Sequence, residues 1–282
     1  MKLVRFGAAG AEKPGVVDAQ GVIRDLSAHV RDITGEVLGA ASLDKLRRID
    51  VKSLPAAPQG VRVGAPVGQV RNFIAVGLNY ADHAKETGAP IPKEPILFSK
   101  LPNCIVGPND DVMIPKGSLK LDYEVEIAFV VGKRARYVEE KDALSHIAGY
   151  AICNDVSERH FQSERGGQWM KGKCAETFGP LGPWLVTRDE IEDVQDLAMS
   201  LDVNGQRRQN GSTKTMIFGI QHLMHYISQF MVLEPGDVVT TGTPPGVALG
   251  MKPPAWLKAG DVMTLAIQGL GEQTQKVVPF KE

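Results

Sequence analysis

The sequence predicts a mixed α+β fold that is mainly β. Its apolar residues fall into many short alternating runs bounded by glycine and proline, and only a few stretches show helical spacing. The segment at residues 54–60, Leu-Pro-Ala-Ala-Pro-Gln-Gly, breaks regular structure. We therefore expect a small N-terminal α/β domain over residues 1–65 and a larger, mainly β domain over residues 66–282.

Composition and charge exclude several classes of function. The 282 residues carry a net charge of −1 with no long run of one sign, so nothing favours binding to nucleic acid or an anionic membrane. No apolar run approaches the ~18 residues of a spanning helix, and the N-terminus lacks the apolar core of a signal peptide. The three cysteines, Cys104, Cys153 and Cys174, form no Cys-x-x-Cys pair and fit reduced thiols. We expect a cytoplasmic protein that acts on a small molecule.

The N-terminal region is expected to begin with strands at residues 2–6 and 15–18, followed by a turn at Gln20-Gly21. Residues 37–49 show the spacing of an amphipathic helix, with an apolar face formed by Val37, Leu38, Leu43, Leu46 and Ile49. No residue pattern in this region indicates chemistry. We expect it to serve packing or contacts between subunits.

The larger region is expected to begin with a strand at residues 71–76 and a short helix at residues 80–86. Asn79 is a suitable N-cap for this helix, and Gly88 a suitable stop. His83 and Glu86 lie three residues apart and share a helix face, so the carboxylate could orient the imidazole as a general base. A pair of surface residues on a short helix is the simpler alternative.

Two further patterns predict regular structure later in the chain. Asn204-Gly205 predicts a hairpin turn after a strand at residues 197–203. Thr215 is expected to cap a helix over residues 216–231, with an apolar face formed by Ile220, Leu223, Met224, Ile227 and Met231.

The strongest chemical pattern is a strand expected at residues 121–131. Apolar residues alternate along it with Asp122, Glu124 and Glu126, so the three carboxylates point to one face. Neighbouring carboxylates repel one another and are costly to bury unless a positive charge lies between them. Hard divalent cations prefer such oxygen ligands. A solvated acidic strand face is the alternative.

Three later features bear on this site. Asp155 ends an apolar strand at residues 149–154 and could be a third metal ligand or an N-cap. Lys173 lies in a glycine-rich stretch, where an exposed lysine is the common situation. Residues 240–246 are also glycine-rich but lack the Gly-Lys-Ser/Thr end of a phosphate loop, so a nucleotide site is not indicated.

Taken together, these pieces resemble the fumarylacetoacetate hydrolase family. The resemblance covers roughly residues 71–280 and rests on an ordered set of motifs: Gly77-Leu-Asn-Tyr-Ala-Asp-His-Ala-Lys-Glu86, Asp122-Tyr-Glu-Val-Glu126, Asn154-Asp155 with Arg159 and Gln162, Gly172-Lys173 before Phe178-Gly-Pro180, and Thr241-Gly-Thr-Pro244. It implies a β-sandwich or roll as the catalytic domain, usually in a homodimer.

The resemblance also implies roles for individual residues. It places Mg²⁺ or Mn²⁺ on Glu124, Glu126 and Asp155. It makes His83 and Glu86 the pair that activates water, and it puts the family's lysine at Lys173. The family's substrate-contacting arginine, glutamine and threonine fall on Arg159, Gln162 and Thr243.

Some positions depart from the common family pattern. Glu158 and His160 stand where many members have Ala and Asp, and Glu176 stands where many have Asp. The segment at residues 164–169, Glu-Arg-Gly-Gly-Gln-Trp, is a longer and polar version of its loop. With Ser157-Glu-Arg159 it is similar to the branch acting on 2,4-diketo-3-deoxy sugar acids, such as deoxyrhamnonate or deoxyfuconate derivatives. Similar proteins also carry the label ureidoglycolate lyase.

The activity implied is hydrolysis of a C–C bond in an acylpyruvate or a 2,4-diketo-3-deoxy sugar acid, giving pyruvate and a second acid. An oxaloacetate decarboxylase, an oxo-acid isomerase or hydratase, and a non-enzymatic binder of oxo acids remain open. The His83–Glu86 pair favours the hydrolase, because only hydrolysis requires a base that activates water for attack on a carbonyl carbon.

Overall fold

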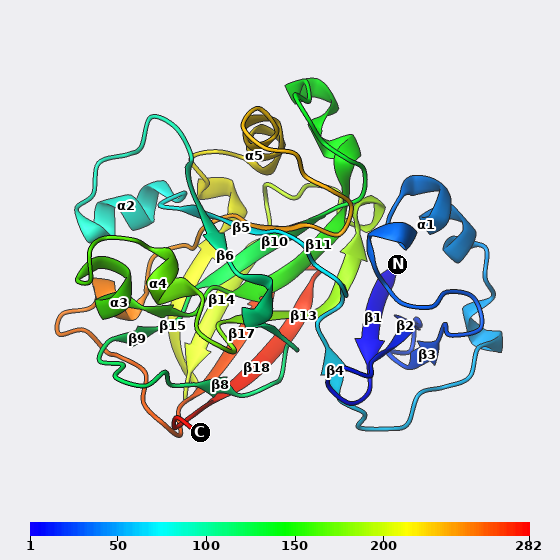
Figure 1. The fold of residues 1–282 in the computed structure, drawn as a ribbon, viewed down its shortest axis with the longest axis horizontal. Coiled ribbons are helices and arrows are strands. Elements are labelled where there is room, and N and C mark those ends of the chain that lie inside the picture. Colours follow the sequence, from blue (N-terminus) through cyan, green and yellow to red (C-terminus); the bar gives the residue numbers. More distant parts are fainter.

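Two large β-sheets with few helices make up the computed structural model, which describes the backbone of residues 1–282 and every side chain except that of Thr87 (Figure 1). The strands are β1 (Lys2–Phe6), β2 (Lys13–Val17), β3 (Ile23–Asp25), β4 (Val63–Gly64), β5 (Phe73–Gly77), β6 (Ile96–Lys100), β7 (Ile105–Val106), β8 (Val112–Met113), β9 (Leu121–Asp122), β10 (Val125–Val131), β11 (Ile147–Asn154), β12 (Ser157–Glu158), β13 (Gly179–Thr187), β14 (Ala198–Val203), β15 (Gln206–Ser212), β16 (Val238–Thr240), β17 (Val262–Ile267) and β18 (Gly271–Val278).

The helices are short. The α-helices are α1 (Ala40–Arg47), α2 (Ala81–Thr87), α3 (Arg159–Ser163), α4 (Met170–Lys173) and α5 (Ile220–Ser228). The 3₁₀ segments are η1 (Gly35–Val37), η2 (Val51–Ser53), η3 (Pro102–Cys104), η4 (Glu140–His146), η5 (Arg188–Glu190), η6 (Thr213–Thr215) and η7 (Ala248–Gly250). This content confirms the mixed, mainly β fold class predicted from the sequence.

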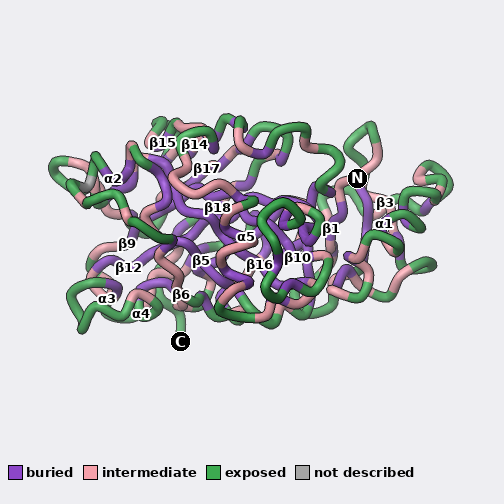
Figure 2. The backbone as a smooth tube through the Cα atoms, turned by 90° about the horizontal axis from the view of Figure 1, so that it is seen from above, coloured by how far each residue is buried: buried purple, intermediate pink, exposed green. Residues whose placement is uncertain are grey.

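The larger sheet runs in the order β3-β2-β1-β13-β11-β10-β16-β5-β6, with β4 beside β1 and β7 beside β13. The second sheet runs in the order β15-β14-β17-β18-β8, and β12 pairs with β9 alone. Strand β10 lies in the interior of the larger sheet, between β11 and β16, and all seven of its residues are buried. The burial colouring of Figure 2 shows the sheet interior buried and the outer loops largely exposed.

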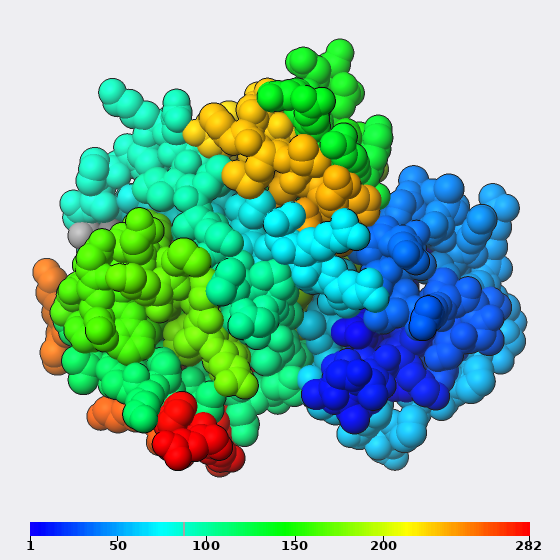
Figure 3. Space-filling model, viewed as in Figure 1, coloured from blue at the N-terminus to red at the C-terminus, as the bar shows by residue number. Residues whose placement is uncertain are grey.

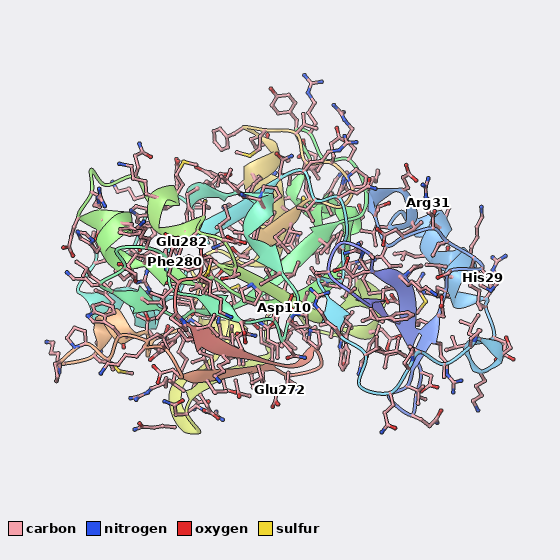
Figure 4. All side chains as sticks on the ribbon, turned by 60° about the horizontal axis from the view of Figure 1, so that its bottom comes forward. His29, Arg31, Asp110, Glu272, Phe280 and Glu282 are labelled. Carbon is pink, nitrogen blue, oxygen red and sulfur yellow. The ribbon has the colours of Figure 1, made fainter. Side chains whose placement is uncertain are left out.

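The N-terminal strands extend the larger sheet, because β1 pairs antiparallel with β13. The expected strands and the turn at Gln20-Gly21 are present as β1, β2 and β3, and the expected helix is present as the shorter α1. Residues of this region form a lobe on one side of the molecule (Figure 3). His29 and Arg31 lie on its outer side, away from Phe280 and Glu282 at the other end of the chain (Figure 4). The domain division at residue 65 stays a prediction.

Two local predictions were wrong. Asn79 does not cap α2, because its side chain binds elsewhere: the amide donates to the carbonyls of Phe218 and Thr241 and accepts from the Phe218 N–H. The helix expected at residues 216–231 spans only Ile220–Ser228 and begins after Gly219. Gly88 does end α2, with a left-handed φ of 69° that favours glycine.

The hairpin turn was predicted correctly. Asn204 and Gly205 connect β14 to β15 with φ angles of 52° and 75°, as a type I′ turn requires. None of the helices in the described chain is long and apolar enough to cross a membrane.

Candidate active site

Two neighbouring strands bring three carboxylates together. β10 pairs antiparallel with β11 so that Val125 faces Asn154, and the next residue of the chain, Asp155, donates its N–H to the Glu124 carbonyl at 3.0 Å. Glu124 and Glu126 are two residues apart and share a face. One oxygen from each of Glu124, Glu126 and Asp155 lies within 4.8 Å of the others. The sequence-predicted set is therefore assembled in space.

The strand carrying these residues is interrupted and not solvated. Side-chain oxygens of Asn154 and Gln209 accept the N–H groups of Glu124 and Val125, at 3.1 and 2.9 Å, in place of a neighbouring strand. This divides the strand predicted at residues 121–131 into β9 and β10. Glu124 and Glu126 are 5% and 1% exposed, so the alternative of a solvated acidic face is wrong.

Glu124 is held ionised by two cations. Lys173 Nζ donates to Glu124 Oε2 at 2.6 Å, and Arg159 Nη2 donates to Oε1 at 2.5 Å. Burial alone would favour the neutral acid, but these charges outweigh it and lower the pKa of Glu124. Glu126 differs: among the described residues its recorded hydrogen-bond donor is the Gly242 N–H, at 2.9 Å. Burial, Asp155 and Glu124 together raise the pKa of Glu126 well above its usual range.

Two buried lysines connect Asp155 to the rest of the site. Lys173 Nζ donates to Asp155 Oδ2 at 2.6 Å and Lys100 Nζ donates to Oδ1 at 2.6 Å. Lys100 also donates to the carbonyls of Lys173 and Phe178, at 2.6 and 3.0 Å, and is fully buried. Burial opposes its charge, yet Asp155 raises the pKa of Lys100 above its ordinary value. The expectation of an ordinary exposed Lys173 does not hold, since that residue is 2% exposed.

Arg159 links Glu124 to Asp122, which in turn binds the loop at residues 248–249. Its Nε donates to Asp122 Oδ2 at 2.8 Å, and its Nη1 donates to Gln162 Oε1 at 3.0 Å. The Asp122 carboxylate also accepts the N–H groups of Ala248 and Leu249 at 2.7 and 3.2 Å. Asp122 therefore holds Arg159 and the η7 segment and is not part of the three-carboxylate cluster.

The His83–Glu86 pair lies on α2 beside the same loop. His83 Nδ1 and Glu86 Oε2 are 3.1 Å apart. The Glu86 carboxylate also accepts the Gly246 N–H, at 3.0 and 3.2 Å from its two oxygens. Gly250 leaves the space for it, because a Cβ built on Gly250 would lie 2.5 Å from Glu86 Cδ. His83 is 8% exposed, so it is not on the surface of its helix.

Thr243 lies in the loop that follows β16. Its hydroxyl donates to the Val125 carbonyl at 2.9 Å and accepts from Gln209 Nε2 at 2.8 Å. These bonds tie the loop to β10 at the level of Glu124 and Glu126. The expected contact between Thr243 and a substrate stays a prediction.

One cavity of about 270 Å³ joins these groups. It is lined by eight predicted site residues: His83, Glu124, Glu126, Asp155, Arg159, Gln162, Lys173 and Thr243. Its other lining residues are chiefly apolar: Val76, Gly77, Leu78, Ala89, Ile96, Phe98, Ser163, Trp169, Gly242 and Leu249. Glu86, the ninth predicted residue, does not line the cavity but contacts His83. Motifs spread over 160 residues of sequence thus converge on one site.

The sequence matches a known family over most of its length. Residues 72–278 match the sequence model of the fumarylacetoacetate (FAA) hydrolase C-terminal domain. The chain belongs to the fumarylacetoacetate hydrolase family. A relative from Burkholderia cenocepacia (strain HI2424), named provisionally as a hydrolase without a substrate, is 57% identical over 277 residues, which cover 98% of each chain.

Solved structures of this family have the same fold. The fumarylacetoacetate hydrolase of Exiguobacterium antarcticum superposes with a TM-score of 0.88 and is 38% identical over 99% of this chain and 100% of its own. The maleylpyruvate hydrolase of Sphingobium sp. SYK-6, solved with manganese(II) and pyruvate, gives 0.83 and 27% over the whole of both chains. The 2-hydroxyhepta-2,4-diene-1,7-dioate isomerase of Mycobacterium marinum gives 0.79 and 30%, also over both whole chains.

The donor set fits a hard divalent cation. Metal–oxygen distances are about 2.0–2.6 Å for Mg²⁺ and Ca²⁺, so two oxygens on one ion lie at most about 4–5 Å apart. The oxygens of Glu124, Glu126 and Asp155 meet this limit. Four buried carboxylates, these three and Asp122, face three buried cations, Lys100, Arg159 and Lys173, which leaves one carboxylate without a cationic partner. A cation bound between the three carboxylates would relieve their repulsion.

Sequence reasoning missed two residues of this network. Lys100 is the last residue of β6, where a lysine is commonly exposed, so no local signal marks it. Asp122 was predicted to share a strand face with Glu124 and Glu126, and its partner Arg159 could be recognised only from the fold. Glu158, noted as a departure from the family, is fully buried and accepts N–H groups from Lys120 and His160.

Proposed function

We propose that the protein is a divalent-metal-dependent hydrolase that cleaves a C–C bond in a 2,4-diketo acid to give pyruvate and a second acid. The observation that carries the proposal is one small cavity lined both by three convergent carboxylates and by an imidazole paired with a carboxylate. The names of two solved relatives, fumarylacetoacetate hydrolase and maleylpyruvate hydrolase, support this class, as does the manganese(II) and pyruvate bound to the second.

Glu124, Glu126 and Asp155 would hold Mg²⁺ or Mn²⁺. A cation bound there would supply positive charge close to the substrate's oxygen atoms, which favours the release of a carbanion as an enolate. Arg159 and Gln162 line the cavity beside Glu124, and their mutual hydrogen bond orients the Gln162 amide. In our proposal these two residues and Thr243 contact the substrate's oxygen atoms.

His83 acts as the general base. Since Nδ1 is engaged with Glu86, we assign the proton transfer to Nε2, which takes a proton from water. The hydroxide adds to the distal carbonyl carbon, and the negative charge that develops on its oxygen is stabilised by the Lys173 ammonium. The oxyanion re-forms a C=O bond as the C–C bond breaks, and the electron pair of that C–C bond leaves with pyruvate as the enolate. The His83 imidazolium then returns its proton to the enolate carbon, which completes pyruvate. Glu86 stabilises the imidazolium formed in the first step.

The distal acyl group is the finer part of the proposal. A simple acylpyruvate and a 2,4-diketo-3-deoxy sugar acid of the rhamnonate or fuconate type present the same reacting atoms and differ only in this group. The loop at residues 164–169 and the sequence around Ser157 favour the sugar acid. A homodimer also belongs to the proposal, and analytical ultracentrifugation tests it.

A second function is favoured by one observation: several solved relatives are named as isomerases, including that of Mycobacterium marinum. An isomerase moves protons and keeps the carbon chain intact. A decarboxylase of oxaloacetate would release CO₂, and a ureidoglycolate lyase would release urea.

The test is incubation with a panel of acylpyruvates, diketo sugar acids, ureidoglycolate and oxaloacetate, with Mg²⁺ or Mn²⁺ and after chelation. We expect stoichiometric pyruvate and a carboxylic acid from the diketo acids, only in the presence of metal. Full activity in thoroughly chelated enzyme, or conversion without loss of the carbon chain, would contradict the proposal.

A further inference from the structure

One wall of the cavity is built from apolar side chains packed against a glycine. Trp169 lies directly on Gly77, where a Cβ would come within 2.2 Å of the indole Cζ3. The Phe98 ring meets Trp169 edge to face with the centroids 5.5 Å apart, and Lys173 Nζ lies 5.5 Å from the Phe98 centroid. Ile96 and Leu249 line the cavity with them. This aromatic wall therefore starts beside the reacting end of the site.

The lysine and arginine side chains of the cavity lie with the three carboxylates, and Lys173 also meets the edge of the wall at Phe98. Among the described residues that line it, the cationic side chains of Lys and Arg are Lys173 and Arg159 alone. Both are already paired: Lys173 with Glu124 and Asp155, and Arg159 with Asp122 and Glu124. The proposed mechanism already uses both cations at the reacting atoms. A second anionic group placed beyond Phe98, against Ile96, Trp169 and Leu249, would meet no further lysine or arginine of the described lining.

The aromatic wall also bounds one side of the cavity, whose volume is about 270 Å³. Since the indole is held by contact with Gly77 and Phe98, the wall is fixed by packing. A long acyl chain would have to displace it.

We propose that this aromatic wall selects 2,4-diketo acids with a short, uncharged acyl group and rejects those whose acyl group ends in a second carboxylate, with Trp169 setting the length. The inference rests on the proposed function. It separates this chain from solved relatives named for maleylpyruvate and for 2-hydroxyhepta-2,4-diene-1,7-dioate, both of which are dicarboxylates. Placing an ionised carboxylate against apolar side chains without a partner is strongly unfavourable. A lactoyl group, as in a deoxyrhamnonate derivative, is also short and uncharged, so the wall would accept it.

The experiment compares two acids of equal acyl length, butanoylpyruvate and succinylpyruvate, which differ by a terminal methyl and a terminal carboxylate. We expect kcat/KM with Mn²⁺ to favour butanoylpyruvate on the order of tenfold or more, because a buried polar mismatch is discriminated strongly. Equal values, or a preference for succinylpyruvate, would overturn the inference.

Binding separates this inference from the proposed function. In Mn²⁺-loaded His83→Ala protein, calorimetric titration with the same two acids should show the same preference even though cleavage is slow. If wild-type protein cleaves neither acid but the variant binds butanoylpyruvate preferentially, the hydrolase proposal fails and the wall inference stands. If wild-type protein cleaves both acids and the variant binds them with equal affinity, the hydrolase proposal stands and the wall inference fails.

A charge introduced into the wall should weaken the preference. Leu249 is 46% exposed, so Leu249→Arg tests the wall without burying the new cation. We expect the ratio of kcat/KM for succinylpyruvate over butanoylpyruvate to rise about tenfold in Leu249→Arg and to stay near the wild-type value in Leu249→Gln. Trp169→Ala should raise kcat/KM for alkanoylpyruvates longer than butanoylpyruvate, relative to kcat/KM for butanoylpyruvate. Trp169→Phe should raise this ratio less. An unchanged chain-length profile in Trp169→Ala would remove Trp169 from the proposal.

Discussion

The two sides of the active site are built in different ways. The floor consists of Glu124, Glu126 and Asp155 with their cations Lys100, Arg159 and Lys173, and each of these residues is 7% exposed or less. The roof is α2, a helix of seven residues that carries His83 and Glu86. In the floor, Glu126 lies on β10 and Asp155 directly follows β11, both inside the 11-stranded sheet. Buried ion pairs join Glu124 and Asp155 to the three cations. The roof is held instead by recorded side-chain bonds to the loop at residues 246–250 and to Thr215.

This difference assigns separate tasks to the two sides. Charges that must stay close together despite repulsion need a framework that cannot relax, and paired strands provide one. A base that acts on water needs only correct orientation, which one carboxylate and one backbone N–H can give. If the comparison is right, changes in the floor abolish metal binding, and changes in the roof reduce the rate while leaving metal binding intact.

The largest effect is expected for Glu126→Gln. It should abolish activity and greatly weaken Mn²⁺ binding, because it removes one of three anionic ligands. The metal-free variant should unfold at the same temperature as wild type or higher, since the change removes a carboxylate repelled by Asp155 and Glu124. Manganese titration and thermal unfolding measure both properties.

Glu124→Gln is the matched control within the floor. It also removes a ligand, but it leaves Lys173 and Arg159 without their shared partner. Breaking buried ion pairs costs about 3–5 kcal/mol of stability. Equal thermal stability of the two metal-free variants would show that the ion pairs at Glu124 do not support the floor.

The second effect concerns the roof. His83→Ala should reduce the rate of acylpyruvate cleavage by on the order of 10²–10⁴, the usual contribution of a positioned base. Mn²⁺ affinity should remain within about twofold of wild type, because His83 is outside the carboxylate cluster. Steady-state kinetics and Mn²⁺ titration of the same preparation test both statements. Near-normal cleavage by His83→Ala would move the assignment toward an isomerase or decarboxylase.

The sequence predicted the three carboxylates of the floor better than the cations that pair with them. Alternation alone placed Glu124 and Glu126 on one face, because a strand has a fixed period of two. Asp155 was an open choice between a ligand and an N-cap until the family resemblance decided it. Lys100 could not be predicted, because its three acceptors come from residues 55–78 positions away in the chain.

The helix α2 of the roof was also predicted only in part. Its helix and its stop at Gly88 follow from residue preferences, and both were predicted. Its N-terminus was not, because Asn79 had the right side chain for a cap but found partners more than 130 residues away. Tertiary hydrogen bonds replaced a local preference worth about 1 kcal/mol.

A smaller effect is expected from Gly250→Ala. The new Cβ would lie 2.5–2.8 Å from the Glu86 carboxylate, which must then move from the Gly246 N–H. We expect kcat to fall on the order of tenfold, less than the 10²–10⁴ contribution of a general base because the base itself remains, with Mn²⁺ affinity unchanged. The acid limb of the pH–rate profile should shift as well, which a general loss of stability would not cause.

Gly39→Ala is the matched control for that change. A Cβ on Gly39 meets its first neighbour, the Gly132 carbonyl oxygen, at 3.7 Å, an ordinary contact distance. Its activity and pH profile should equal those of wild type. If Gly250→Ala also behaved as wild type, the contact between the loop and Glu86 would not orient the base.

The smallest effect is a pH dependence of stability that belongs to the floor alone. The folded protein raises the pKa of Glu126 above its ordinary value of 4.5, so between these two pKa values the folded state binds a proton that the unfolded state has lost. The metal-free protein should therefore lose stability as pH rises above about 4.5, until the folded pKa is passed. Glu124 has the opposite shift, and its stabilising contribution is already complete above the unfolded pKa. Comparing wild type with Glu126→Gln at pH 5.5, 6.5 and 7.5 isolates the Glu126 contribution, because all other groups are shared. We expect the unfolding temperature of metal-free wild type to fall relative to the variant as pH increases, and saturating Mn²⁺ to remove that trend. Parallel pH curves for the two metal-free proteins would mean that Glu126 is ionised without a cation, and that the floor tolerates its excess charge.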